Sequence, residues 1–432
     1  MLNVLKLHNR EKIQTVLLCG IAAMLLFKNY SNVVIVMAAV YNIICFNRKN
    51  FYKLKSYAFI FPSVFLLVAV ISSFFSKNMD EGFNSIQLYL LPMLIGISIL
   101  NSKIDRLLII KVCQSFFLAS VVSATILISY ASYKIIGESD IQDIIFHGFT
   151  AFYDQHPVYY AVLLSLALFY ASTSKSSQLN KYLKRVGAVI LIIALILCAS
   201  KIVLVVNAIA YLYLLGVEIK ANRQNIIYLF GFIAVVTIIY HIPFVKERFV
   251  DGLKMEKTTL EFQPTNNFRD KKLFTYTEKQ KISDLELRYI LWHIGVYHLI
   301  EDGKLLTGYG QGDVQDYLDY YYYSYNLAPN WNEGRNIHNQ YLHVWVTYGL
   351  LMFLLFIGYM IYSLRAAIIS KDRLHLFFIG VLSIVFIFEV MLVRNLGINL
   401  FYFFNTLFLI KTIYFEDSHP RNQRHTQQPR GI

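Results

Sequence analysis

Long apolar runs separated by short polar connections dominate the pattern of this chain. Runs such as residues 57–75 and 186–199 are continuous and do not alternate with polar positions. That pattern is typical of membrane-spanning helices, because the strands of a membrane barrel alternate between lipid and lumen. We predict an all-α polytopic membrane protein with about 12 transmembrane helices. The predicted spans are residues 13–27, 33–46, 57–75, 86–100, 107–134, 157–171, 186–199, 202–217, 225–241, 338–363, 374–393 and 397–414.

The composition agrees with this prediction and excludes other classes of protein. Hydrophobic residues make up 56% of the chain and charged residues only 16%, whereas soluble proteins carry about 25% charged residues. The four cysteines fall inside predicted spans, without the spacing of a disulfide framework or a zinc site. The sequence is therefore not that of a soluble, disordered or disulfide-stapled protein.

The net charge of +13 suggests either a nucleic-acid partner or an asymmetric membrane protein. When the connections between predicted spans are sorted alternately, 22 of the 40 lysines and arginines fall on one side and five in the short connections on the other. By the positive-inside rule, the richer side is cytoplasmic. We therefore expect both termini of the chain to lie in the cytoplasm.

One long polar segment interrupts the series of spans. We predict a single transmembrane domain at residues 1–415, with an extracytoplasmic loop at residues 244–336 between the ninth and tenth helices, and a disordered cytoplasmic tail at residues 416–432. The loop carries 12 basic and 14 acidic residues, and this near neutrality argues against nucleic-acid binding. A loop of this length is usually functional or disordered, and its helix-forming, aromatic-rich last third favours function.

A candidate for chemistry lies where the loop re-enters the membrane, at Arg335 and His338. His338, Leu342, Trp345 and Gly349 are spaced along one face of a predicted helix. An imidazole at the membrane rim can accept a proton from a hydroxyl, and Arg335 can hold an anion beside it. Taken alone, however, His338 is better explained as a helix cap at the interface.

Two further features allow two interpretations each, and a third, a glycine-rich segment, allows one. Glu389 lies inside the predicted eleventh span, where a charge marks either a site or a structural ion pair, with Arg394 as the candidate partner. Six tyrosines between Tyr317 and Tyr325 predict either a sugar-binding platform or an aromatic belt at the lipid headgroups. The glycines of residues 308–312 lack the spacing of a dinucleotide fingerprint and predict a tight turn over the site.

Several short motifs occur in a fixed order along the chain. They are His156-Pro157, Ser200-Lys201, Arg288 with Trp292, Leu305–Gly312, and His338-Asn339 followed after nine residues by Gly349. Together these motifs resemble those of the O-antigen ligase and polymerase superfamily, and the predicted spans and the long outer loop also match that family's topology. Two positions depart from its pattern, because Met352 replaces a small or polar residue and Lys201 replaces an arginine.

The resemblance implies a GT-C-like fold in the bacterial inner membrane. It implies transfer of a glycan from an undecaprenyl-diphosphate carrier to an acceptor sugar hydroxyl at the outer face, in lipopolysaccharide O-antigen or exopolysaccharide biosynthesis. His338 is then the base or the acceptor-orienting group. Arg288 and Arg335 are then ligands of the diphosphate, since such a leaving group needs cations. No metal or cofactor is expected, because the loop lacks a carboxylate cluster of the DxD type.

Other residues are expected to contact substrate by the same resemblance. Lys201 keeps the charge of the family arginine but not its bidentate geometry. Arg288 has a plainer explanation as well, namely a loop ion pair with Asp284 or Glu286. The remaining expected substrate contacts are Asn339, Trp292, His156 and Glu389.

The motifs leave the exact activity open. A ligase, whose acceptor is a lipid A-core sugar, and a polymerase, whose acceptor is another repeat unit, share them. A protein O-oligosaccharyltransferase is a third member of this class. A transporter of lipid-linked glycan without chemistry is the rival from another class, and the lack of internal repeats in the sequence argues against it.

Overall fold

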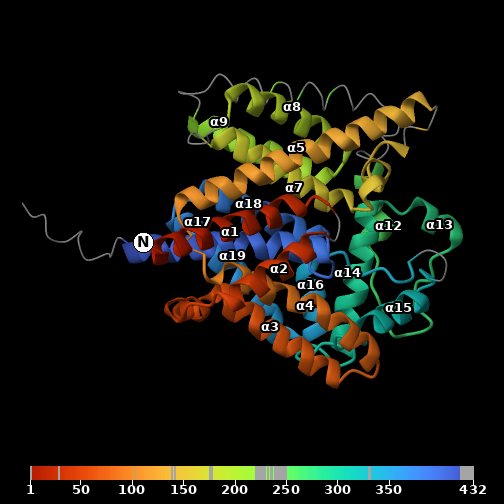
Figure 1. Cartoon of the computed structure of the whole chain (residues 1–432). Coiled ribbons are helices and arrows are strands. Elements are labelled where there is room, and N and C mark those ends of the chain that lie inside the picture. Colours follow the sequence, from red (N-terminus) through yellow and green to blue (C-terminus); the bar gives the residue numbers. More distant parts are fainter. Residues whose placement is uncertain are drawn as a thin grey trace, which may run out of the picture.

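The computed structural model describes residues 2–27, 30–102, 104–137, 143–174, 179–218, 251–328 and 332–418, together with positions 140, 230, 233 and 237. Every regular element in these ranges is a helix (Figure 1), which confirms the all-α prediction. In chain order the elements are α1 (Leu2–Met24), α2 (Tyr30–Ile44), η1 (Arg48–Lys55), α3 (Tyr57–Phe74), α4 (Met79–Leu100), α5 (Arg106–Ile136), α6 (His147–Thr150), η3 (Ala151–Tyr153), α7 (Pro157–Thr173), α8 (Lys181–Leu197), α9 (Lys201–Glu218), η4 (Asp251–Leu253), α12 (Lys257–Leu260), α13 (Tyr276–Lys281), α14 (Asp284–Glu301), α15 (Val314–Ser324), α16 (Gln340–Tyr348), α17 (Leu350–Ile369), α18 (Arg373–Phe388) and α19 (Asn395–Ser418).

Four helices of the described part are long and apolar enough to cross a membrane, namely α3, α4, α5 and α17. The helices α2, α7 and α18 and the first part of α9 are apolar but shorter. These helices support a multi-pass membrane protein. The full set of 12 spans stays a prediction, because the expected ninth span at residues 225–241 lies almost entirely outside the described residues. The expected tail also lies outside them beyond residue 418.

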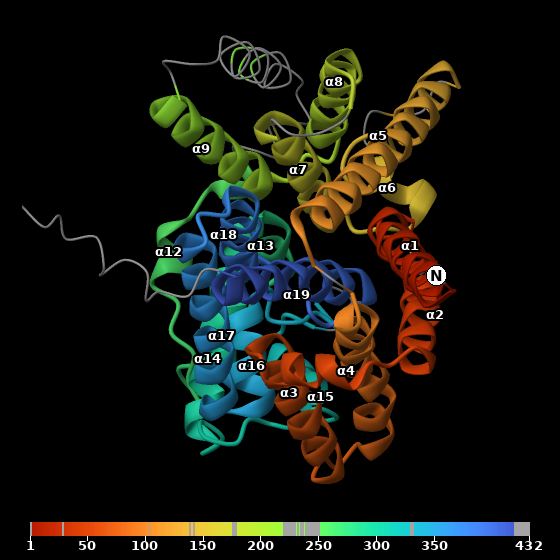
Figure 2. The same ribbon diagram turned by 60° about the vertical axis from the view of Figure 1, so that its left-hand side comes forward.

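Two helices form the centre of the bundle. Residues 157–170 of α7 are all buried, and so are residues 397–410 of α19. Figure 2 shows α19 crossing the middle of the bundle, between α17 and α18 on one side and α4 on the other. A helix that is apolar all round belongs in such a position, because each of its faces is covered by a neighbour.

The predicted span 338–363 is two helices, so the prediction of one continuous helix from His338 is wrong. The first helix, α16, is capped by Asn339, whose side-chain oxygen accepts a hydrogen bond from the Leu342 amide at 3.0 Å. It ends at Gly349, which has a φ of +81°. A Cβ there would lie 2.0 Å from the Leu306 carbonyl oxygen. Glycine therefore allows the loop to pass at the break between α16 and α17.

The helices α12–α15 gather at one end of the bundle (Figure 1) and have a hydrophobic core of their own. Leu291, Ile294 and Leu318 are buried in that core. The loop is joined to the bundle by polar contacts, since Asp313 accepts hydrogen bonds from the backbone amides of Lys77 and Asn78, each at 2.8 Å. We call the segment 251–336, within its described residues, the loop domain.

The glycines of residues 308–312 form a tight turn, as predicted, but the turn contacts the C-terminal end of α16 and not the segment with His338 before that helix. Gly308 and Gly310 have positive φ angles of +70° and +105°. A Cβ on Gly312 would lie 2.0 Å from the Asn78 carbonyl oxygen. The backbone amide of Gly310 donates to the Thr347 carbonyl oxygen at 2.9 Å. The turn therefore packs closely against both the α3–α4 connection and α16.

The tyrosine-rich segment is mainly part of the loop-domain core. Tyr322 and Tyr325 are fully buried, whereas Tyr320 and Tyr323 are 66% and 57% exposed. Neither a sugar platform nor an aromatic belt describes the buried members, whose rings fill the space beside α14. The helical period of 3.6 residues places Tyr321, Tyr322 and Tyr325 toward the core and Tyr320 and Tyr323 toward the surface.

Candidate active site

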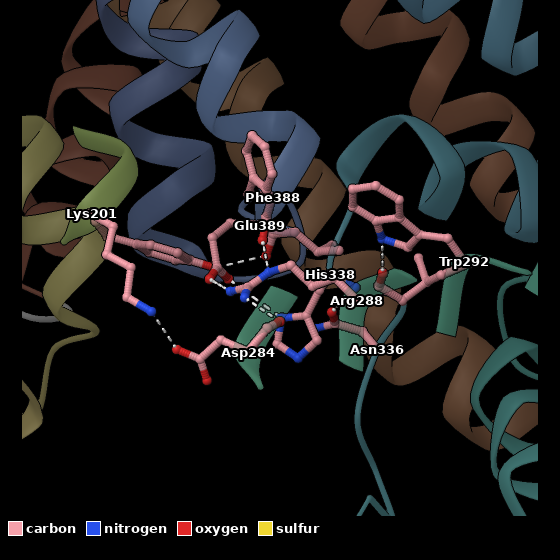
Figure 3. A network of polar contacts seen from close by, with 11 residues as sticks. Lys201, Asp284, Arg288, Trp292, Asn336, His338, Phe388 and Glu389 are labelled. Carbon is pink, nitrogen blue, oxygen red and sulfur yellow. Dashed lines mark hydrogen bonds and ion pairs between the residues drawn. The ribbon is translucent and has the colours of Figure 1, made fainter. Parts of the chain in front are cut away.

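Three segments far apart in the chain meet where the loop domain joins the bundle (Figure 3). They are the second turn of α14 with Arg288, the segment just before α16 with His338, and the break after α18 with Glu389. The structure therefore brings together the two residues expected to act in catalysis and one expected to contact substrate. In each segment a different local feature of the backbone positions the side chain.

Arg288 is placed by a well-capped helix. Ser283 and Glu286 form a capping box at the start of α14, in which each side chain accepts a hydrogen bond from the other residue's backbone amide. The Arg288 guanidinium then donates three hydrogen bonds. The acceptors are the Phe388 carbonyl oxygen at 3.1 Å, the Asp284 carbonyl oxygen at 2.9 Å and the Glu389 Oε1 at 3.1 Å.

This geometry excludes the plain explanation of Arg288 as a loop ion pair with a neighbouring carboxylate. Its partner, Glu389, belongs to a segment 101 positions away. The side chains of Arg288 and Glu389 are 22% and 11% exposed. A charged pair this far removed from water is stabilised by its own hydrogen bonds, and its guanidinium faces the place where the segments meet.

Glu389 lies at the end of α18, and the backbone after it is not helical. Its φ and ψ of −144° and 145° are extended, and α19 starts only at Asn395. The expected partner Arg394 is exposed, and Glu389 pairs with Arg288 instead. The broken segment is held by two polar contacts, because Tyr159 donates to the Val390 carbonyl oxygen at 2.7 Å and Gln340 accepts from the Leu392 amide at 2.7 Å.

His338 precedes α16 and adopts a left-handed backbone conformation with a φ of +49°. Its backbone amide donates to Asn336 Oδ1 at 2.8 Å, which is a local turn of the kind that asparagine favours. Its Nδ1 atom lies 3.7 Å from Glu389 Oε2 and has no hydrogen-bond partner within 3.5 Å among the described residues. A non-glycine residue in this conformation is uncommon and marks functional sites more often than others.

Glu389 is therefore shared between a cation and an imidazole. One carboxylate oxygen contacts Arg288 and the other faces His338 (Figure 3). A carboxylate in this place stabilises a protonated imidazole and fixes its orientation. The cluster can hold an anion near Arg288 while His338 takes up a proton.

Trp292 supports the site without reaching into it. Its Nε1 donates to the Ile337 carbonyl oxygen at 2.9 Å, so it holds the backbone next to His338. Asn339, expected to contact substrate, caps α16 and is buried. In this structure both residues position His338.

Lys201 lies beside the cluster. It starts α9 and pairs with the Asp284 carboxylate at 3.1 Å (Figure 3). The carbonyl oxygen of the same Asp284 accepts from Arg288, so one residue links the two cations. A Cβ on Gly252 would lie 2.2 Å from Lys201 Nζ, and that glycine therefore leaves the space which the ammonium group occupies.

His156 and Arg335 complete the set of expected residues. His156 precedes α7, and its Nδ1 is buried without a hydrogen-bond partner among the described residues. Its ring lies 5.0 Å from that of Tyr159, the residue that holds the broken segment after Glu389. Arg335 is exposed, and no contact of its side chain is found within the described ranges.

Three residues that support the site were missed or misread from sequence. Gln340 and Tyr159 anchor the break after Glu389, and Asp284 joins Lys201 to Arg288. Gln340 directly follows the His338-Asn339 motif, and a polar residue at the start of an apolar span was the available signal. No signal indicated Tyr159, because a tyrosine is common at membrane interfaces.

The fold and the site define an all-helical, multi-pass membrane protein with an Arg–Glu–His cluster where a helical loop domain meets the bundle. Residues 186–357 match the family model described as O-antigen ligase. The match confirms the family resemblance inferred from the sequence motifs, and it supports the prediction that the protein is an enzyme. It runs from α8 into α17, and so contains Lys201, Arg288 and His338 but not Glu389. No curated protein matches the chain.

Proposed function

We propose that this chain is a glycosyltransferase that moves a glycan from an undecaprenyl-diphosphate carrier to an acceptor sugar hydroxyl at the outer face of the bacterial inner membrane. The observation that carries the proposal is the carboxylate of Glu389 between Arg288 and His338. A cation for a leaving anion and a base for an attacking hydroxyl are the two groups that this reaction needs.

In the proposed step the acceptor oxygen attacks the anomeric carbon of the donor glycan. A new carbon–oxygen bond forms, and the bond from that carbon to the phosphate oxygen breaks, with its electron pair leaving on the diphosphate. The acceptor proton passes to His338. Glu389 stabilises the resulting imidazolium, and Arg288 stabilises the charge that develops on the diphosphate.

The donor must compete for Arg288. Its guanidinium is already engaged by two backbone carbonyls and Glu389, and a diphosphate offers stronger acceptors than the carbonyls. When the diphosphate replaces the carbonyls, Arg288 can keep its contact with Glu389 Oε1, and Glu389 Oε2 still faces His338 Nδ1 at 3.7 Å. The donor anion and the base are thereby held on either side of one carboxylate.

The remaining residues of the candidate site have supporting roles. Lys201 contributes a second positive charge beside Arg288, and Arg335 contributes one from the exposed rim of the loop domain. Trp292 and Asn339 position His338. His156, whose ring lies 5.0 Å from that of Tyr159, contacts the acceptor. These cations supply the charge stabilisation, so the proposed reaction is independent of a metal.

The proposal includes the orientation of the chain. The excess of lysines and arginines on alternate connections favours cytoplasmic termini and 12 spans. The loop domain, with Arg288, then lies on the outer side. The products belong to lipopolysaccharide O-antigen or exopolysaccharide biosynthesis, and a ligase and a polymerase differ only in the acceptor.

The test is transfer in liposomes that contain the purified full chain, an undecaprenyl-diphosphate glycan and an acceptor glycolipid. The native chain is expected to produce the elongated acceptor and free undecaprenyl diphosphate. Glycan that crosses the bilayer while still attached to its carrier would favour a transporter. A glycosylated protein acceptor, in place of a glycolipid, would favour a protein O-oligosaccharyltransferase.

The acceptor class is tested in cells by the surface glycan of a deletion strain. Loss of chain length with single repeat units remaining indicates a polymerase. Full-length glycan that stays on its lipid carrier indicates a ligase. An unchanged surface glycan contradicts the proposed function.

A further inference from the structure

A groove of about 630 Å³ lies between α3, α17 and α19, away from the candidate active site. It is lined mainly by apolar side chains, among them Tyr57, Ile60, Leu354 and Tyr362. Tyr57 starts α3 and Arg365 lies near the end of α17, whereas the loop domain contacts the other ends of these two helices. The groove therefore belongs to the half of the bundle opposite the loop domain.

A glycine keeps the groove open. Gly358 lies within α17, where glycine costs about 1 kcal/mol relative to alanine. A Cβ at this position would meet no atom within 4 Å, so no close approach of a neighbouring helix requires glycine there. The side chains around it are turned outward, with Leu354, Leu355 and Ile60 at 54%, 41% and 41% exposed. In a membrane this surface faces acyl chains.

The length of the groove corresponds to one leaflet. From Leu354 to Arg365 the helix α17 extends about 16 Å at its rise per residue. The hydrocarbon core of a bilayer is about 30 Å thick. An occupant of the groove therefore spans roughly half of the membrane.

A positively charged side chain, that of Arg365, lies at one end of the groove, and this end is the one farther from the loop domain. Among the described residues that line the groove, Arg365 is the only charged one. Its side chain is exposed, and no ion pair or hydrogen bond to it is found among the described residues. A guanidinium binds phosphate oxygens in a bidentate manner. An apolar groove with a guanidinium at one end thus fits an amphiphile with an apolar chain and a phosphate.

We propose that this groove binds one acyl chain of an anionic glycerophospholipid whose phosphate contacts Arg365. The predicted orientation places Arg365 at the cytoplasmic surface, where anionic headgroups are attracted to basic residues near the membrane. The polyprenyl tail of the donor is the less suitable occupant, because its diphosphate would bind at Arg288, at the opposite end of the bundle.

The experiment is native mass spectrometry of the full chain released from nanodiscs that contain phosphatidylglycerol and phosphatidylcholine with the same acyl chains. The native chain is expected to retain one phosphatidylglycerol in preference to phosphatidylcholine. Arg365→Gln is expected to lower that preference by about fivefold, the effect of one basic residue near the membrane surface. Gly358→Leu fills the groove and is expected to remove the retained lipid of either kind.

Two matched variants control this experiment. Lys181→Gln removes an exposed charge on the same predicted side at the start of α8. Gly380→Leu adds a side chain to α18 at a glycine whose Cβ would also meet nothing within 4 Å. Both are expected to retain lipid as the native chain does. Native retention by Arg365→Gln or by Gly358→Leu would overturn the proposal, and so would retention of an undecaprenyl lipid that phosphatidylglycerol fails to displace.

Discussion

The guanidinium of Arg288 and the carboxylate of Glu389, 101 positions apart in the chain, form an ion pair of 3.1 Å. The pair connects α14 of the loop domain to the break after α18, so it links the two parts of the protein at the candidate active site. Both residues are more than three-quarters buried. Removing one partner therefore leaves the other charge without its partner in a poorly solvated place.

A double-mutant cycle on this pair is expected to show strong coupling. Arg288→Gln and Glu389→Gln should each destabilise the protein by about 2–3 kcal/mol, because each leaves an unpaired buried charge. The double variant should cost less than the sum of the two single variants. Thermal unfolding of the purified chain in detergent measures the three values. Additive losses would show that the pair does not act as a unit.

Gly349 and Gly303 provide a matched test of the break between α16 and α17. Both have positive φ angles, of +81° and +66°. A Cβ at Gly349 would lie 2.0 Å from a backbone carbonyl, whereas at Gly303 it would meet nothing within 4 Å. Gly303→Ala should lower the free energy of unfolding by about 1 kcal/mol, because a residue with a Cβ disfavours the left-handed backbone conformation. Gly349→Ala should unfold at a clearly lower temperature, and equal melting temperatures would contradict the described loop packing.

His298 is expected to make the loop domain sensitive to acid. The side chain is 1% exposed and stacks on Tyr321 at 3.7 Å between ring centroids. Burial, with a smaller effect of Lys271, lowers the pKa of His298 to about 4. The unfolded chain, with an ordinary histidine pKa of about 6.5, then binds the proton more strongly than the folded one. The stability that neutral His298 contributes is present above pH 6.5 and is lost as the pH falls toward 4.

Protonation of His298 is expected to lower the free energy of unfolding by about 2 kcal/mol between pH 7 and pH 4.5. Hydrogen exchange of the α14 and α15 amides at the two pH values measures it. His298→Gln, which cannot be protonated, should make the protection of these amides much less dependent on pH. A variant with the same pH dependence as the native chain would assign the effect to another group.

Lys201 is expected to act mainly in donor binding. Its ammonium pairs with Asp284 beside Arg288 and is 16% exposed at the side chain. Lys201→Ala should raise the KM for the lipid-linked donor by about tenfold, the equivalent of one charged contact of ~1.4 kcal/mol, with a smaller change in kcat. Lys279→Ala, a half-buried lysine on α13, serves as the control. A loss confined to kcat would instead place Lys201 in the chemical step.

The sequence predicted the helical class, and it singled out the residues that meet in the candidate site, but it did not reveal how they are held. Apolar runs revealed the helices because burial in lipid demands continuous hydrophobicity. Arg288 and His338 were found from motifs, and the structure brings them to one carboxylate. The partner of Glu389 could not be predicted from the sequence. Sequence spacing indicated the nearby Arg394, whereas the actual contact joins Glu389, at the end of α18, to Arg288 on α14.

The breaks within apolar segments were also beyond the sequence pattern. The residues around Gly349 and after Glu389 keep an apolar composition, yet their backbones leave the helix. The reasons lie in tertiary packing, namely the carbonyl oxygen of Leu306 at Gly349 and the contact of Gln340 with the Leu392 amide. Such contacts depend on residues distant in the chain, so the local period gives no sign of them.

The central claim is that His338 acts as the base of glycan transfer, and His338→Ala in the reconstituted liposomes tests it most directly. The variant should lose about 10²- to 10⁴-fold of the transfer rate while it keeps the native melting temperature and still binds the donor. His293→Ala on α14, a half-buried histidine outside the cluster, is the matched control and should transfer at the native rate. Native rates of transfer by His338→Ala would contradict the account.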